Sequence, residues 1–157
     1  MALLKCVKNE FAEYVGECKE SKVKVDTEGV ECVVLKGDLM ERSKEKHHAR
    51  KSCDCLILAK LDAEIVVIYV ELRKRGRKLG EVKKKMETCY DLLQDVLRVC
   101  KGGQRTVRQI FALVQKGIRA PEIARLRSMR IHCREKDYHI LPKPSPLELK
   151  KLLERLA

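Results

Sequence analysis

Two hydrophobic patterns alternate along the chain, one with helical spacing and one with continuous apolar runs. Apolar residues recur every three or four positions in 2–19 and 81–100, which predicts two amphipathic helices. Continuous apolar runs at 56–58, 65–70 and 107–114 are typical of strands that are buried on both faces. These five segments predict a sheet covered by helices.

The remaining segments are shorter and more polar. Val23 to Val34 alternates around Thr27-Glu28-Gly29 and predicts a hairpin or a strand with a bulge, whereas 37–51 has no period and predicts a long loop. Pro121 predicts the start of a short helix. Further on we expect two short strands (130–133 and 138–141), a stiff proline linker (142–146) and a final helix (145–157) with a Ser145/Glu148 capping box.

These elements predict an α/β fold with a central mixed sheet flanked by helices. A chain of 157 residues is long enough to bury a substantial core, and we expect one domain. Its parts would be an N-terminal helix (1–20), a core (22–141) and a C-terminal helix (145–157).

Polar residues stand at the open ends of the hairpin formed by the runs around 57 and 68. If the turn is centred between Asp62 and Ala63, Asp54 lies opposite Glu71, and Arg73 shares the face of Glu71. Two facing carboxylates repel unless a cation lies between them, and Mg²⁺ or Mn²⁺ prefers such oxygen ligands. The register is a hypothesis, because a slip of one residue separates the two side chains. The alternative is that both are ordinary residues at the rim of the sheet.

Charge adds a candidate partner. The 35 Lys and Arg residues exceed the 23 Asp and Glu residues by 12, and the excess clusters at 44–51 and 73–85. Such clusters favour a polyanion, and we expect them to bind the phosphate backbone of nucleic acid through Arg50, Lys51, Lys74, Arg75, Arg77 and Lys78. Few aromatic residues are available for stacking bases, so a duplex or branched ligand is favoured, with DNA expected. The alternative is a solvated loop.

Cysteine usage leaves several interpretations open. The start of the chain lacks a signal-peptide pattern and no apolar run could span a bilayer, so we expect a cytoplasmic protein that does not bind membranes. Its eight Cys would normally be reduced thiols, but the composition resembles that of hyperthermophile proteins, which can carry disulfides. Pairing remains open. Zinc at His47, His48, Cys53 and Cys55, where both Cys would share a face, and a thiol site at Cys133 with His132 or His139 are weaker alternatives.

The order of motifs resembles a known superfamily. CD-x-LIL before a hairpin, VIYVELR closing it, and then a helix and the strand QIFALV resemble the PD-(D/E)XK nucleases, in particular small archaeal members, over roughly residues 30–141. The resemblance implies a restriction-endonuclease-like core in which Asp54 and Glu71 bind the metal. Arg73 occupies the position of the assisting lysine. A helical Glu often completes such sites, and Glu10 and Glu13 are candidates.

The expected function is therefore a metal-dependent nuclease with Asp54, Glu71 and Arg73 as its catalytic residues. Arg73 is a departure, because an arginine stays protonated and cannot act as a base, although it can bind phosphate. The alternative is a nuclease-fold protein without catalysis that binds nucleic acid or serves as an assembly subunit. By analogy with nucleases that cut two strands, a homodimer is a further expectation.

Overall fold

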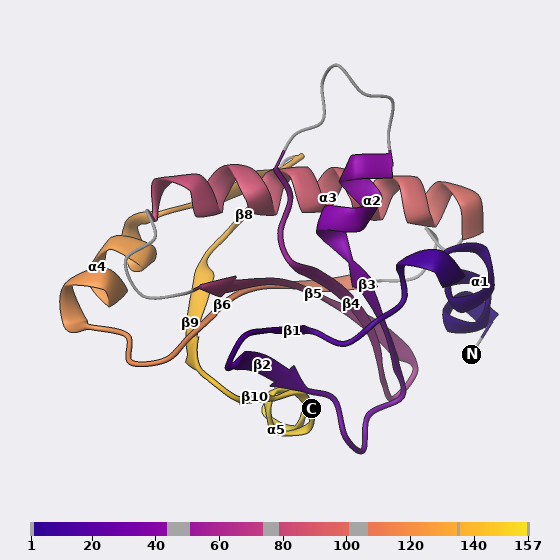
Figure 1. Cartoon of the computed structure of the whole chain (residues 1–157), viewed down its shortest axis with the longest axis horizontal. Helices are drawn as coiled ribbons and strands as arrows, with labels where there is room; N and C mark the ends of the chain where they lie inside the picture. Colours follow the sequence, from indigo (N-terminus) through magenta and orange to yellow (C-terminus); the bar gives the residue numbers. More distant parts are fainter. Residues whose placement is uncertain (1, 44–50, 74–78, 101–106, 135, 157) are drawn as a thin grey trace.

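A five-stranded mixed sheet forms the centre of the protein (Figure 1). The computed structural model describes residues 2–43, 51–73, 79–100, 107–134 and 136–156. The sheet order is β3-β4-β5-β6-β9, with antiparallel pairing from β3 to β5 and parallel pairing from β5 to β9. The strands are β3 (Cys32–Lys36), β4 (Cys55–Leu61), β5 (Glu64–Arg73), β6 (Val107–Gln115) and β9 (Ile140–Pro144). The predicted α/β class with a central mixed sheet is confirmed.

Both faces of this sheet are covered (Figure 1). The long helix α3 crosses one face, with α1 and α2 on the same side, and a small three-stranded sheet with α5 covers the other face. The helices are α1 (Ala2–Glu10), α2 (Gly37–Ser43), α3 (Gly80–Cys100), α4 (Ala120–Ser128) and α5 (Leu149–Glu154). The remaining elements are a 3₁₀ turn, η1 (Ala12–Tyr14), and the strands β1 (Lys19–Glu20), β2 (Val23–Asp26), β7 (Ile131–Cys133), β8 (Lys136–Tyr138) and β10 (Leu147–Glu148).

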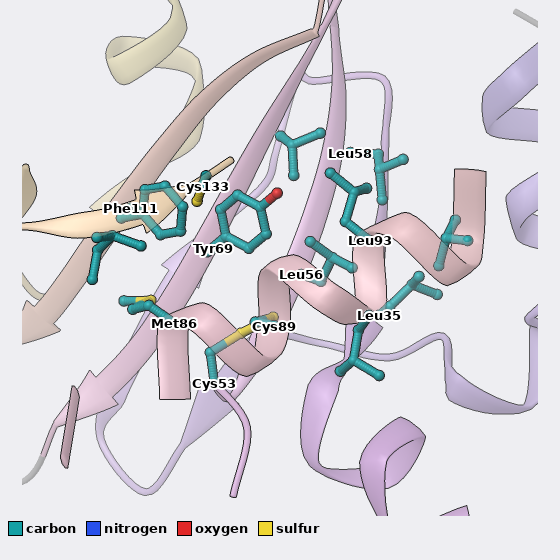
Figure 2. Packing of buried hydrophobic residues seen from close by; sticks show 14 of the residues in the cluster. Leu35, Cys53, Leu56, Leu58, Tyr69, Met86, Cys89, Leu93, Phe111 and Cys133 are labelled. Atoms are coloured by element: carbon teal, nitrogen blue, oxygen red, sulfur yellow. A yellow bond between two sulfur atoms is a disulfide. The ribbon is translucent and has the colours of Figure 1, made fainter. Parts of the chain in front are cut away.

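Alternate residues of each central strand enter two separate cores. Leu56 and Tyr69 face α3, whereas Ile57 and Ile68 face the small sheet and α5. Figure 2 shows the α3 side, where the rings of Tyr69 and Phe111 stack with centroids 4.4 Å apart. Each fully buried aliphatic side chain contributes about 1.5–3 kcal/mol. Burial on both faces is the reason for the continuous apolar runs of these strands.

Two predictions for the first third of the chain are wrong. The N-terminal helix ends at Glu10 and not near residue 19, and a 3₁₀ turn follows. The segments β2 and β3 do not form a hairpin, because β2 pairs with β1 and β10 while β3 pairs with β4. Alternation identifies a strand but does not select its partner.

Residues 37–43 are helical, although a loop was predicted there. Met40 of α2 is buried in the α3-side core, and this burial anchors a short helix whose polar sequence gives little helical signal. The rest of the predicted loop, 44–50, lies outside the described residues.

The C-terminal prediction is also partly wrong. The predicted proline linker is strand β9, which pairs with β6. The helix α5 begins at Leu149, and its N-cap residue Glu148 makes no side-chain capping bond. Ser145 does not cap this helix, because its hydroxyl accepts a hydrogen bond from the backbone N–H of Lys24 at 3.1 Å. That bond ties the segment before β10 to β2.

Three disulfides cross between elements. Cys6–Cys100 joins α1 to the end of α3, Cys18–Cys55 joins the segment before β1 to β4, and Cys53–Cys89 joins the segment before β4 to α3 (Figure 2). Cys32 and Cys133 are free thiols. The prediction that Cys53 and Cys55 share a face is wrong, because they belong to opposite cores. The chain bends at Asp54 before the regular strand begins.

Candidate metal centre

The hairpin register brings Asp54 and Glu71 together. Cys55 pairs with Val70 as the last pair of the β4–β5 ladder, and Asp54, in the bend before β4, lies beside Glu71 close enough for a hydrogen bond between the two carboxyl groups. Oδ2 of Asp54 accepts a hydrogen bond from the backbone N–H of Leu72 at 2.7 Å. This bond fixes the Asp54 carboxylate against the end of β5.

The backbone before Asp54 is held by close packing. The N–H of Gly37 donates to the carbonyl oxygen of Asp54 at 3.1 Å. A Cβ atom on Gly37 would lie only 2.3 Å from the carbonyl oxygen of Cys53, so this approach requires glycine. The disulfides at Cys53 and Cys55 hold the same segment from opposite faces of the sheet. The backbone of Asp54 is therefore held in place by the hydrogen bond from Gly37 and by the disulfides of the residues before and after it.

Burial and mutual repulsion make this carboxylate pair unusual. Asp54 is 8% exposed and Glu71 is 3% exposed. Burial, followed by the charge of Glu71 and a hydrogen bond between the two carboxyl groups, raises the pKa of Asp54 from 3.8 to about 7, although the N–H of Leu72 opposes the shift. Asp54 is thus close to half-protonated at neutral pH, and any cation at this point would favour its ionised form.

A lysine on α3 supplies one positive charge to the pair. Nζ of Lys85 lies 2.6 Å from Oε2 of Glu71, and the Lys85 side chain is only 15% exposed. Lys85 was not identified from the sequence. A signal was present, because Val82, Lys85 and Cys89 are spaced by three and four residues and so lie along the buried stripe of the helix. A lysine on such a stripe needs a buried partner.

Arg73 follows Glu71 by two residues but makes different contacts. Its Nη1 donates to Oε1 of Gln115 at 2.9 Å, and the same atom forms an ion pair with Oε2 of Glu122 in α4. Arg73 is 7% exposed. The hydrogen bond from Arg73 holds the pKa of Glu122 below its ordinary value. These contacts join the ends of β5 and β6 to α4.

A surface cavity of about 500 Å³ adjoins the carboxylates at Lys85. It is lined by residues of α3 together with Lys51, namely Lys51, Glu81, Lys84, Lys85, Glu87 and Thr88. Nζ of Lys51 lies 3.8 Å from Oε1 of Glu81, and the Lys51 side chain is 77% exposed. Lys51 is thus the predicted phosphate-binding residue that the structure places at the site. The others, Arg50, Lys74, Arg75, Arg77 and Lys78, lie outside the described residues.

The two carboxylates fit a hard divalent cation. Oε1 of Glu71 is buried and, among the described residues, no donor reaches it. Mg²⁺ commonly uses one or two carboxylates and keeps several waters or substrate oxygens as its other ligands. No group of three or more His, Cys, Asp or Glu residues is arranged for a metal ion in the part of the chain that the structure describes, so Glu10 and Glu13 do not complete this pair.

The alternative sites gain no support from the geometry. Cys53 and Cys55 are bonded to other cysteines, so in this form they are not available as zinc ligands, and His47 and His48 lie outside the described residues. Burial raises the pKa of the Cys133 thiol to about 12, which keeps it protonated and unreactive at neutral pH.

In the described ranges, no helix is both long enough and apolar enough to cross a membrane. Protein-family models, curated proteins and solved structures were compared with the chain, and none of them matches it.

Proposed function

We propose that this protein is a metal-dependent nuclease with a restriction-endonuclease-like core, which hydrolyses phosphodiester bonds in duplex or branched DNA. The observation that carries the proposal is the convergence of Asp54, Glu71 and Lys85 at one buried point. Among the described residues, Lys85 is bound to Glu71 and no cation is bound to Asp54, so a divalent cation would find two carboxylates there and would favour the ionised form of Asp54. The observed order of hairpin, helix and parallel strand supports the proposed core.

In this proposal Asp54 and Glu71 hold Mg²⁺ or Mn²⁺ through carboxylate oxygens. The bound cation would activate a water molecule and neutralise charge on the phosphate. Hydrolysis would join the water oxygen to phosphorus and break one ester P–O bond, and the proton given up by the water would balance the proton taken up by the leaving oxygen. Lys85 is paired with Glu71 and would place a positive charge beside the phosphate, where negative charge develops.

Lys85 takes the cationic role that the resemblance gave to position 73. Arg73 remains charged at all relevant pH values, and its Nη1 is bound to Gln115 and Glu122. We therefore propose that Arg73 supports the site by holding α4, and that Lys85 is the cation that faces the substrate.

A second candidate is a nucleic-acid-binding protein without catalysis. It is favoured by the contacts of Arg73 with Gln115 and with Glu122 of α4. Because of these contacts, the residue at the position of the assisting lysine has a structural role. Lys51 and Lys85 at the cavity would still contact a phosphate backbone in that case.

Cleavage assays with matched variants separate the two candidates. Supercoiled, linear and branched DNA are incubated with Mg²⁺ or Mn²⁺ and with wild type, Asp54→Asn or Lys85→Met. Asp62→Asn is the control for Asp54, because it removes the same charge at the exposed turn of the same hairpin. Lys84→Met is the control for Lys85, because Lys84 lines the same cavity and is exposed.

The nuclease proposal expects metal-dependent cleavage that Asp54→Asn and Lys85→Met reduce at least 100-fold, in line with the roughly 10²–10³-fold cost of losing one charge-stabilising group. The two control variants should retain activity within a few-fold of wild type. Salt-sensitive binding without cleavage of any substrate would instead support the second candidate. A protein that neither binds nor cleaves nucleic acid would refute both.

A further inference from the structure

The helix α4 is attached to the sheet through its one acidic residue. Glu122 is the only Asp or Glu between positions 116 and 130, and it forms an ion pair with the buried Arg73. Leu126, one turn later, is fully buried in the α3-side core. The negative charge of α4 is therefore paired with Arg73 at the end of β5, on the side of the helix that faces the sheet.

The exposed residues around α4 are positively charged. Four cations are exposed in this stretch, and no acidic residue is exposed with them: Lys116, Arg119, Arg125 and Arg127. Within the described ranges, the guanidinium groups of Arg125 and Arg127 make no ion pair and no hydrogen bond. Arg130 differs, because its Nη1 donates to the carbonyl oxygen of Arg127 at 2.6 Å. Arg125 and Arg127 are thus available to an external anion.

The position of α4 relates these cations to the carboxylates. Figure 1 shows α4 beyond the ends of β5 and β6, at the edge of the sheet that also carries Glu71. Arg73 lies two residues past Glu71, roughly 7 Å along the strand. Arg127 lies five residues past Glu122, which adds roughly 8 Å along the helix. With the span of the Arg73–Glu122 ion pair added, both arginines lie within roughly 25 Å of the carboxylates, which is less than one turn of B-form DNA (about 34 Å).

We propose that Arg125 and Arg127, which are two residues apart and so lie on opposite flanks of α4, form a second contact surface for the phosphate backbone of the DNA duplex that occupies the carboxylate site, with one arginine on each side of the helix. This inference rests on the nucleic-acid partner of the proposed function. A merely solvated helix face does not require arginine, whereas the planar guanidinium group binds two phosphate oxygens at once. Arg73, through Glu122, is the positioning residue that keeps this surface at the edge of the sheet.

The test measures DNA binding in EDTA, so that it does not depend on cleavage. A fluorescently labelled duplex is titrated with wild type and with Arg125→Glu/Arg127→Glu, between about 0.05 and about 0.2 M salt. The control is Lys150→Glu/Arg155→Glu, which makes the same change in net charge on α5. Those residues are exposed, and α5 lies near the opposite end of the sheet, where Arg108 at the start of β6 donates to the carbonyl oxygen of Leu156 at 2.9 Å. Circular dichroism checks that each variant is folded.

The loss of two phosphate contacts lowers the slope of log affinity against log salt by about two, which at about 0.1 M salt is a loss on the order of 10- to 100-fold. The control should lose less than about threefold. Equal losses in both variants, or no loss in the α4 variant, would overturn the proposal.

The same titration separates this proposal from the nuclease itself. Wild type that binds duplex in EDTA but does not cleave it in Mg²⁺ would refute the nuclease, while a selective loss in the α4 variant would still support the surface. Wild type that does not bind duplex at low salt would overturn the surface proposal and the nucleic-acid partner together.

Discussion

Replacing Asp54 by Asn should stabilise the metal-free protein at alkaline pH. At pH 8 the wild-type site holds two buried carboxylates, and in the described part of the chain the only cation bound to them is the Lys85 ammonium, on Glu71. In the variant, the amide oxygen of residue 54 can still accept the N–H of Leu72. Its amide N–H₂ can donate to Oε1 of Glu71, which no donor reaches among the described residues. The substitution removes a repulsion and adds a donor at the same point.

The pKa of Asp54 sets the size and direction of the effect. The folded pKa of about 7 lies above the unfolded value of 3.8, so the folded state binds the proton more tightly. The contribution of Asp54 to stability is therefore constant below about pH 4, falls as the pH rises to about 7, and is constant again above that. Three pKa units correspond to about 4 kcal/mol of unfolding free energy.

Urea denaturation in EDTA, with the disulfides intact, measures this difference. The free energy of unfolding of Asp54→Asn minus that of wild type should rise by about 4 kcal/mol between pH 4 and pH 8, because titrating groups that do not interact with Asp54 cancel in the difference. Asp62→Asn, at the exposed hairpin turn, should show no such rise. A difference that stays constant with pH, or a wild type that is the more stable protein at pH 8, would refute the assignment of a raised pKa to Asp54.

Three further predictions follow from neighbouring contacts. Gly37→Ala should destabilise the protein by about 1–3 kcal/mol, because the added Cβ would meet the carbonyl oxygen of Cys53. Gly80→Ala, whose Cβ would meet nothing within 4 Å, should be neutral. Thermal denaturation checks both variants, and equal midpoints would contradict the close approach at Gly37. Cys53→Ala/Cys89→Ala should cost roughly 3–4 kcal/mol, as expected for a disulfide that closes a loop of this length, and an unchanged urea midpoint relative to Cys32→Ala would count against this pairing. Arg73→Met should lower the urea midpoint because it removes the hydrogen bond to Gln115 and the ion pair with Glu122, but it should leave the rate of cleavage by folded protein at saturating DNA within a few-fold of wild type; a 100-fold loss of that rate would make Arg73 catalytic.

Local patterns in the sequence predicted the centre of the site. The register of Asp54 and Glu71 depends only on the two-residue turn between β4 and β5, and the stripe of α3 depends only on helical period. Both signals act over short distances along the chain. For this reason the two carboxylates could be paired from the amino-acid sequence alone.

Long-range contacts could not be predicted in the same way. The role of Lys85 depends on how α3 crosses the sheet, and the role of Arg73 depends on Glu122, which lies 49 residues further along the chain. Disulfide pairing has the same limit, since no local pattern selects Cys89 as the partner of Cys53. The two carboxylates could therefore be paired from the sequence, whereas the contacts of Lys85 and Arg73 could be seen only in the folded structure.

Calorimetric titration of the protein with Mn²⁺ tests the central claim most directly. Wild type should bind one ion per chain, and Asp54→Asn and Glu71→Gln should each weaken binding by at least about tenfold, because each removes a ligand. Asp62→Asn should bind as wild type does. Binding that is unchanged in Asp54→Asn and Glu71→Gln, or no binding by wild type, would contradict the assignment of these two carboxylates as a metal centre.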